Sequence, residues 1–286
     1  MNTVSIASSA MLVELSIGTW TARKLDKSVT EEVNMSKKAS SQASRVNKNL
    51  LPGVEQLDAI TKYAGMVRNW MYSQTLPWSD FGARLITTEA FFDFKRALDD
   101  HEKEFNRLVD TFIAEYPSLI SMQAFKLGDM FNRREYPTAE EIASKFKFRV
   151  SYMPVPDSGD FRVDIGNEAV AELQAHYQRD FGEKLDQAMA DVRKRLLEEL
   201  HHMSERMTDK EDGKPKLFRR NVVDSLSTSL ARIRQLNITK DEAIEAMVSQ
   251  AEKAVAGLDG QSLKESDTLR RNVREKIDGI LGAFDF

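Results

Sequence analysis

The sequence predicts an α+β protein that is predominantly helical, with a long helical hairpin, a small three-stranded antiparallel sheet and a C-terminal helical subdomain. Apolar residues recur every three or four positions through most of the chain, which is the period of an amphipathic helix. Only residues 12–20 and 145–166 show the alternation that is typical of strands. Hydrophobic residues make up 41% of the 286 positions, which is enough for a substantial core.

The first strand is expected at residues 12–20, because apolar residues alternate there with polar or small ones. A helix is then expected to begin after Thr30 and to continue unevenly to about residue 51, where Pro52 and Gly53 stop it. Helical spacing returns at residues 57–71 and ends in the segment TLPWSDFG, residues 75–82, which reads as a loop.

The central region is expected to contain two helices and a hairpin. One helix covers residues 88–116 and ends before a proline, and a shorter one covers 119–131. Thr138 is followed three residues later by Glu141, a capping box that predicts a short helix. Strands at 146–153 and 160–165 share an apolar face, and their other faces carry opposite charges, so we expect a structural hairpin joined by the first strand.

A helix of about forty residues is predicted after the hairpin, because apolar residues lie three or four apart from Val170 to Met207 without a proline. A helix of this length needs a long partner, and the helix at 88–116 is expected to pack against it as an antiparallel, coiled-coil-like hairpin. The polar loop at 208–216 predicts a division into an N-terminal domain, residues 1–207, and a C-terminal subdomain, residues 208–286. Its three helices are expected at 217–236, 239–256 and 266–283.

Several chemistries find no support in the sequence. The absence of cysteine removes disulfides, thiolate nucleophiles and cysteine-ligated metals. No phosphate-loop, dinucleotide-binding or hydrolase-type nucleophile motif occurs. The pair formed by Glu198 and His201 has the spacing of a di-iron ligand motif, but only one copy is present where two are needed. We therefore expect no catalytic residues, no metal site and no cofactor.

The N-terminal region lacks the pattern of a signal peptide, since Glu14 interrupts its apolar stretch. No window approaches the roughly 20 apolar residues that span a bilayer. We expect a cytoplasmic protein with no membrane association.

Two features indicate possible interaction sites. The segment SKKASSQASRVNK, residues 36–48, is basic and serine-rich, and the tetrapeptide RRNV occurs twice near the C-terminus. Cations of this kind contact phosphates in single-stranded nucleic-acid binders, although an ordinary solvated helix face has the same composition. The candidate nucleic-acid-binding residues are Lys37, Lys38, Arg45, Lys48, Arg219, Arg220, Arg270 and Arg271.

The second feature is the tail LGAFDF, in which Phe284 and Phe286 flank an aspartate. Partner grooves can capture such an aromatic tail, and packing of the tail onto its own helix is the alternative.

Five segments, found in order along residues 10 to about 205, resemble a family of bacteriophage proteins of unknown function. They are LSIGTWTARKLD, SRVNKNLLPG, TLPWSDFGARL, MFNRREYPTAEEIASKFKF and PVPDSGDFRVDIG. The resemblance implies a phage origin and expression inside an infected bacterium. It transfers no catalytic or binding residue.

Our first hypothesis is a non-enzymatic phage protein that acts through protein–protein contacts, as a homo-oligomer, because long amphipathic helices commonly self-associate. The alternative is a single-stranded nucleic-acid-binding protein that serves phage DNA replication or recombination. A third hypothesis is an inhibitor of a host defence protein, which composition does not separate from the first.

Overall fold

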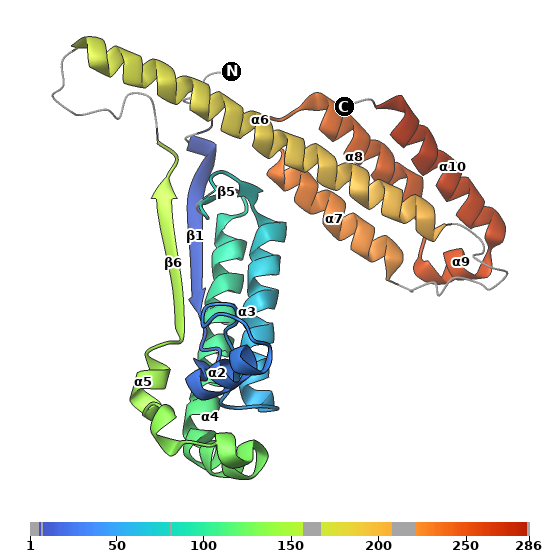
Figure 1. Cartoon of the computed structure of the whole chain (residues 1–286). Coiled ribbons are helices and arrows are strands. Elements are labelled where there is room, and N and C mark those ends of the chain that lie inside the picture. Colours follow the sequence, from blue (N-terminus) through green and yellow to red (C-terminus); the bar gives the residue numbers. More distant parts are fainter. Residues whose placement is uncertain (1–5, 7, 81, 157–166, 208–220, 285–286) are drawn as a thin grey trace. The chain divides into compact units, whose positions relative to one another are not determined.

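The computed structural model of the chain describes residues 6, 8–80, 82–156, 167–207 and 221–284. They form an α+β protein that is predominantly helical, with a four-stranded antiparallel sheet and a two-stranded sheet (Figure 1). The predicted fold class is confirmed. Within these described ranges, no helix has both the length and the hydrophobicity that crossing a membrane requires.

The chain folds into two compact units, and each is assembled from segments that are distant in the sequence. The first unit comprises residues 1–14, 72–94 and 151–286, and the second comprises residues 15–71 and 95–150. Residues on both sides of position 207, where a division was predicted, belong to the first unit. The reason is that the forty-residue helix shares its core with the helices that follow it.

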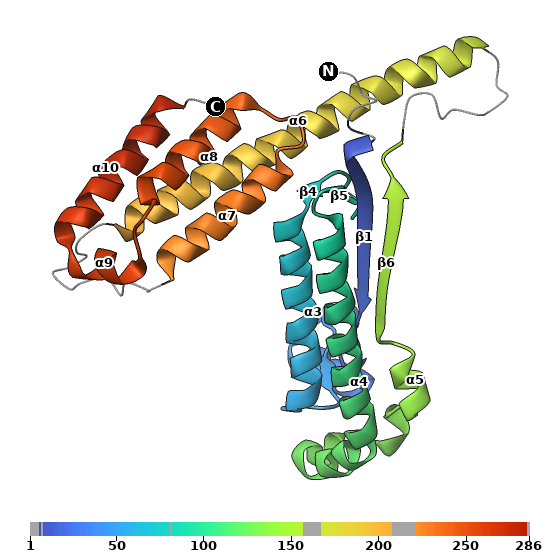
Figure 2. The same ribbon diagram turned by 180° about the vertical axis from the view of Figure 1, so that it is seen from behind.

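The helices of the first unit confirm the long helix and correct its partner. Its helices are α6 (Asn167–Arg206), α7 (Val222–Leu236), α8 (Glu242–Val255), the short α9 (Gly260–Glu265), which was not predicted, and α10 (Asp267–Ala283). Figures 1 and 2 show α7, α8 and α10 beside α6, and all three contact it. Leu196 of α6 shares one buried cluster with Leu230, Met247 and Ile277 of these helices. Most of the helix that was predicted as the partner of α6, at residues 88–116, belongs to the other unit.

The four-stranded sheet has the order β4-β5-β1-β6. Its strands are β1 (Ala10–Gly18), β4 (Leu76–Pro77), β5 (Arg84–Thr87) and β6 (Lys147–Pro154). Leu12 of β1 lies opposite Leu85 of β5 in an antiparallel register. The strands predicted at 12–20 and 146–153 are confirmed with shifted ends, and the strand predicted at 160–165 lies outside the described residues. Strands as short as β4 and β5 are too brief to show a period-two pattern, so they were not predicted.

The second unit contains most of two long helices that pack side by side, α3 (Glu55–Gln74) and α4 (Phe91–Leu127) (Figures 1 and 2). Ile60 of α3 and Phe112 of α4 are fully buried, and Trp20 makes ring contacts with Phe112 and Tyr116. The remaining elements are β2 (Arg23–Leu25), α2 (Lys27–Ser36), β3 (Asn47–Asn49) and α5 (Ala139–Ala143), with two single 3₁₀ turns at Gly128–Met130 and Arg133–Glu135.

Two predicted helix boundaries in the second unit are wrong and one is confirmed. The helix expected to reach residue 51 ends at Ser36. Pro117 lies inside α4, so the two helices expected on either side of it are one. Tertiary packing outweighs the proline here, because Tyr116 and Leu119 around it are both buried. The capping box is confirmed, since Thr138 and Glu141 each accept a hydrogen bond from the other's backbone N–H at the start of α5.

Candidate functional site

The basic, serine-rich segment that follows α2 is a loop built around one buried asparagine. Asn34 is 4% exposed, donates from its side-chain amide to the backbone oxygen of Ser41, and accepts from the Ser44 hydroxyl at 2.7 Å. The loop returns to α2 where the backbone N–H of Val46 donates to the Thr30 hydroxyl. These bonds hold the segment in a defined conformation, which replaces the helix that was predicted here.

The end of α2 explains why the sequence did not reveal this loop. Lys38 has a φ of 50°, in the left-handed region, and the backbone N–H of Ala39 reaches back to the backbone oxygen of Asn34 at 2.8 Å. This is a helix-ending motif in which the left-handed position is usually glycine. Because lysine occupies that position, the sequence carries no visible stop signal after Ser36.

Residues 23–49, which we call the basic module, contain seven lysines and arginines and three acidic residues. Their net charge of seven minus three, +4, contrasts with −4 for the whole chain. Three of the predicted cations, Lys37, Lys38 and Arg45, are exposed. The structure adds three exposed cations that were not predicted: Arg23, Lys24 and Lys27. The segment ARKLDK, residues 22–27, contains these three, and a charge count over both ends of α2 would have found them.

Lys48 is a correction to the predicted nucleic-acid-binding set. Its side chain is 6% exposed, and its ammonium lies 2.6 Å from Glu135 and 3.4 Å from Asp26. It also donates to the backbone oxygen of Met130 at 3.0 Å. Burial alone would lower the pKa of Lys48, but the hydrogen bond and charge of Glu135, together with Asp26, raise it overall. Lys48 is therefore a charged structural residue that is not available to a phosphate.

The other described arginines of the predicted set do not belong to the same unit as the basic module. Arg270 and Arg271 belong to the first unit, whereas the basic module belongs to the second. Arg270 donates to the backbone oxygens of Leu263 and Lys264 and pairs with Asp267, so its guanidinium joins α9 to α10. Arg271 is exposed on α10. Arg219 and Arg220 lie outside the described residues.

Of the two aromatic residues proposed for partner binding, Phe284 packs against the buried cluster of the first unit. The structure thus favours the alternative of packing onto the chain's own helices for this residue. Phe286 lies outside the described residues.

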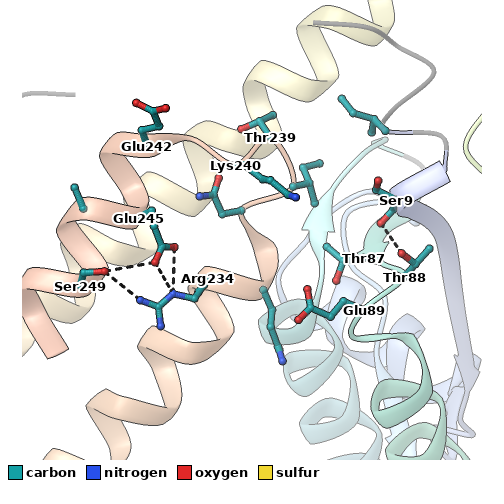
Figure 3. Close-up of a pocket in the computed structure, with 15 residues that line it drawn as sticks. Ser9, Thr87, Thr88, Glu89, Arg234, Thr239, Lys240, Glu242, Glu245 and Ser249 are labelled. Carbon is teal, nitrogen blue, oxygen red and sulfur yellow. Dashed lines mark hydrogen bonds and ion pairs between the residues drawn. The ribbon is translucent and has the colours of Figure 1, made fainter.

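A cleft of about 1030 Å³ opens in the first unit between the end of β5 and the connection from α7 to α8 (Figure 3). Arg234 occupies one wall and donates to both carboxylate oxygens of Glu245 and of Glu252. Most of its donors are therefore already used. Among the described lining residues Glu89, Glu242 and Glu245 face only two cations, Arg234 and Lys240, and no histidine is present. The cleft offers hydrogen bonds to a polar ligand but no imidazole for proton transfer.

His101 lies in an aromatic setting between α3 and α4. Its Nδ1 is 3.0 Å from the hydroxyl of Tyr63, and its ring is 4.6 Å from that of Trp70. Burial lowers the pKa of His101 below 6.5, and Asp100 only partly offsets this. His201, by contrast, is exposed on α6. Within the described part of the chain, no three histidine, aspartate or glutamate side chains are grouped so that they could hold a metal ion.

Three aromatic side chains form a further surface feature of the first unit. Phe92, at the start of α4, is 74% exposed and its ring contacts Phe91, which in turn contacts Tyr152 of β6, both at 5.4 Å between centroids. We call Phe91, Phe92 and Tyr152, whose rings are joined by these contacts, the aromatic patch. In the second unit, Phe125 of α4 is 94% exposed.

Comparisons with protein-family models, with curated proteins and with solved structures give no match for this chain.

Proposed function

We propose that this protein acts without catalysis, through protein–protein contacts, and that it self-associates. The aromatic patch carries the proposal. Large apolar side chains that are exposed together mark interaction surfaces, and aromatic residues and methionine are enriched at such surfaces. The resemblance to phage proteins supports the further proposal that this activity takes place in the cytoplasm of an infected bacterium.

The composition of the patch fits a contact between proteins better than a site for a small molecule. Its aromatic rings contact one another across two elements, α4 and β6, so they present a preformed apolar surface. Burying a side chain such as Phe92 on association contributes about 1.5–3 kcal/mol, and a few aromatic anchors dominate most interfaces.

Sedimentation equilibrium at micromolar concentrations tests this proposal. We expect the wild-type chain to form dimers or larger oligomers, and the substitution Phe92→Ser to weaken association at least about tenfold, or about 1.4 kcal/mol. Phe125→Ser is the matched control, because it removes an even more exposed phenylalanine from the other unit. A wild-type chain that stays monomeric, or equal losses in the two variants, would overturn self-association through the patch.

A second candidate function is single-stranded nucleic-acid binding, and the exposed cations of the basic module favour it. Six of its seven cations are exposed, and its remaining lysine, Lys48, is paired internally. Binding through phosphate contacts releases counterions, so the affinity must fall steeply with salt. Fluorescence anisotropy with a labelled 40-mer single strand across a salt series is the test, and the absence of binding at low salt would reject this function.

A further inference from the structure

The basic module contains a pocket of about 510 Å³ between α2 and the loop that Asn34 organises. Its described lining residues are Leu25, Lys27, Thr30, Glu31, Ser41, Gln42, Ser44 and Arg45. We infer that this pocket binds a phosphate group, held between Lys27 at the start of α2 and Arg45 at the end of the loop. The inference does not depend on self-association, which concerns the other unit.

Both cations of the pocket are available to a ligand. Lys27 and Arg45 are exposed, and neither side chain makes a hydrogen bond or ion pair with another residue in the described part of the chain. Lys48 and Arg270, in contrast, use their charges internally. A planar guanidinium with a nearby ammonium is a common arrangement for phosphate, because the guanidinium donates in parallel to two oxygens and the ammonium adds a point charge.

The neutral groups of the pocket divide into those that shape it and those that can donate. The Thr30 hydroxyl donates to the backbone oxygen of Asp26, and the Ser44 hydroxyl donates to Asn34, so both hydrogens are used to hold the loop. The side chains of Ser41 and Gln42 make no hydrogen bond to other described residues, which leaves a hydroxyl and an amide free to donate to phosphate oxygens.

The loop is ordered before any ligand arrives, which reduces the entropy lost on binding. Asn34 ties Ser41 and Ser44 to α2, and Val46 returns the chain to Thr30. Arg45 lies between Ser44 and Val46 in the sequence, and both of these residues are held by hydrogen bonds. The backbone of Arg45 is therefore fixed, while its side chain is unpaired.

The charge around the pocket favours an anion despite two exposed carboxylates, Glu31 in the lining and Glu32 next to it in the sequence. Glu31 is the single carboxylate among the described lining residues. Four further exposed cations of the module lie near the lining residues in the sequence: Arg23, Lys24, Lys37 and Lys38. The carboxylate of Asp26 is paired with Lys48. The net charge of +4 thus leaves a local positive potential that raises the concentration of anions at this surface.

The phosphate group has two candidate sources. One is a small molecule, either free phosphate or a phosphorylated compound, and the other is the backbone of a nucleic acid. Two titrations separate them. In the first, inorganic phosphate is titrated against the full chain by calorimetry, with chloride at matched ionic strength as the reference. In the second, the labelled single-stranded 40-mer is used. Both compare wild type with Arg45→Gln, Lys27→Gln and Lys37→Gln.

Lys37→Gln is the matched control, because it removes the same charge from the same module but from a residue that does not line the pocket. Since Lys27, Arg45 and Lys37 make no side-chain bonds with other described residues, all three variants are expected to fold, and their thermal transitions verify this. We expect phosphate affinity to fall at least about tenfold in Arg45→Gln and in Lys27→Gln, as for the loss of one charge-assisted hydrogen bond, and to stay within about twofold in Lys37→Gln.

Phosphate binding that is lost in the two pocket variants and kept in Lys37→Gln supports the inference. If the 40-mer then shows the same ranking, the phosphate belongs to a nucleic acid, and if the 40-mer does not bind, it belongs to a small molecule. No phosphate binding beyond the chloride reference, or equal losses in all three variants, overturns the pocket. Binding of the 40-mer with no phosphate site would leave nucleic-acid binding standing without it.

Discussion

The ammonium of Lys48 lies 2.6 Å from a carboxylate oxygen of Glu135, and only 6% of the lysine side chain is exposed. The basic module is thereby fastened to the 3₁₀ turn at Arg133–Glu135 by a charge that the sequence places among exposed lysines. The remaining cations of the module lie at the surface, so one lysine of the basic module stabilises the fold and the other cations are free for a ligand.

Replacing Lys48 with methionine is expected to destabilise the protein strongly, because Asp26 and Glu135 would be left close together without their counter-charge. Removing one partner of a buried ion pair typically costs about 3–5 kcal/mol. Urea unfolding measures this change, and the exposed Lys37→Met serves as the control, with an expected change within about 0.5 kcal/mol. Similar unfolding free energies for the two variants would contradict the structural role of Lys48.

Replacing Lys38 with glycine is expected to stabilise the protein, because Lys38 holds a φ of 50°. The left-handed conformation destabilises a residue with a Cβ by about 1–2 kcal/mol, and glycine avoids this cost. Because glycine also makes the unfolded chain more flexible, the expected net gain in the free energy of unfolding is about 0.5–1 kcal/mol. The neighbour Lys37 has a φ of −91°, so Lys37→Gly should instead lower stability. Thermal unfolding of the two variants compares these opposite signs.

The stability of the protein is expected to fall as the pH drops below 6.5, through His101. Burial lowers the pKa of His101 in the folded state, so between that pKa and 6.5 the unfolded chain binds more protons than the folded chain. Protonation would also remove the lone pair on Nδ1 that can accept the hydrogen of the Tyr63 hydroxyl. The contribution of His101 is therefore complete above pH 6.5 and is lost on acidification.

Unfolding free energies measured at intervals from pH 7.5 to 5 test this prediction, with Trp70 fluorescence as a local probe of the His101 ring. His101→Gln should flatten the profile in this window, and His201→Gln, at an exposed position, should leave it unchanged. A profile that is the same in wild type and His101→Gln would exclude this histidine as the cause.

Replacing Pro117 with alanine is expected to stabilise α4. A proline inside a helix removes one backbone hydrogen bond and clashes with the preceding turn, which destabilises the folded state by about 3 kcal/mol. Proline also stiffens the unfolded chain, which offsets about 0.4–1 kcal/mol of this loss. The difference leaves an expected gain of about 2 kcal/mol in the free energy of unfolding, measured by urea denaturation. Ser118→Ala at the adjacent exposed position is the control. A loss of stability in Pro117→Ala would mean that the burial of Tyr116 and Leu119 depends on the proline.

Local patterns in the sequence predicted the elements whose cause is local. The helical spacing of apolar residues predicted α3 and α6, and Thr138 with Glu141 predicted the start of α5. Each depends on residues within a few turns of one another, so a single stretch of sequence contains the whole signal. The α+β class follows from the same patterns.

The elements that were not predicted depend on contacts that a local pattern does not contain. Buried neighbours keep α4 continuous through Pro117, and Asn34 closes its loop by reaching Ser41 and Ser44. The partners of α6 are chosen by the apolar faces of helices that follow it, so periodicity predicted that the helix needed a partner without indicating which one.

The candidate site shows the same division between composition and packing. Charge counting along the chain identified Lys37, Lys38 and Arg45 as exposed cations, because an unpaired lysine or arginine is solvated wherever it lies on the surface. It also included Lys48, whose ammonium donates to the backbone oxygen of Met130, 82 residues further along the chain. The sequence therefore determines how much charge the basic module carries, while folding determines which charges are neutralised, because ion pairing depends on distance in space and not on distance along the chain.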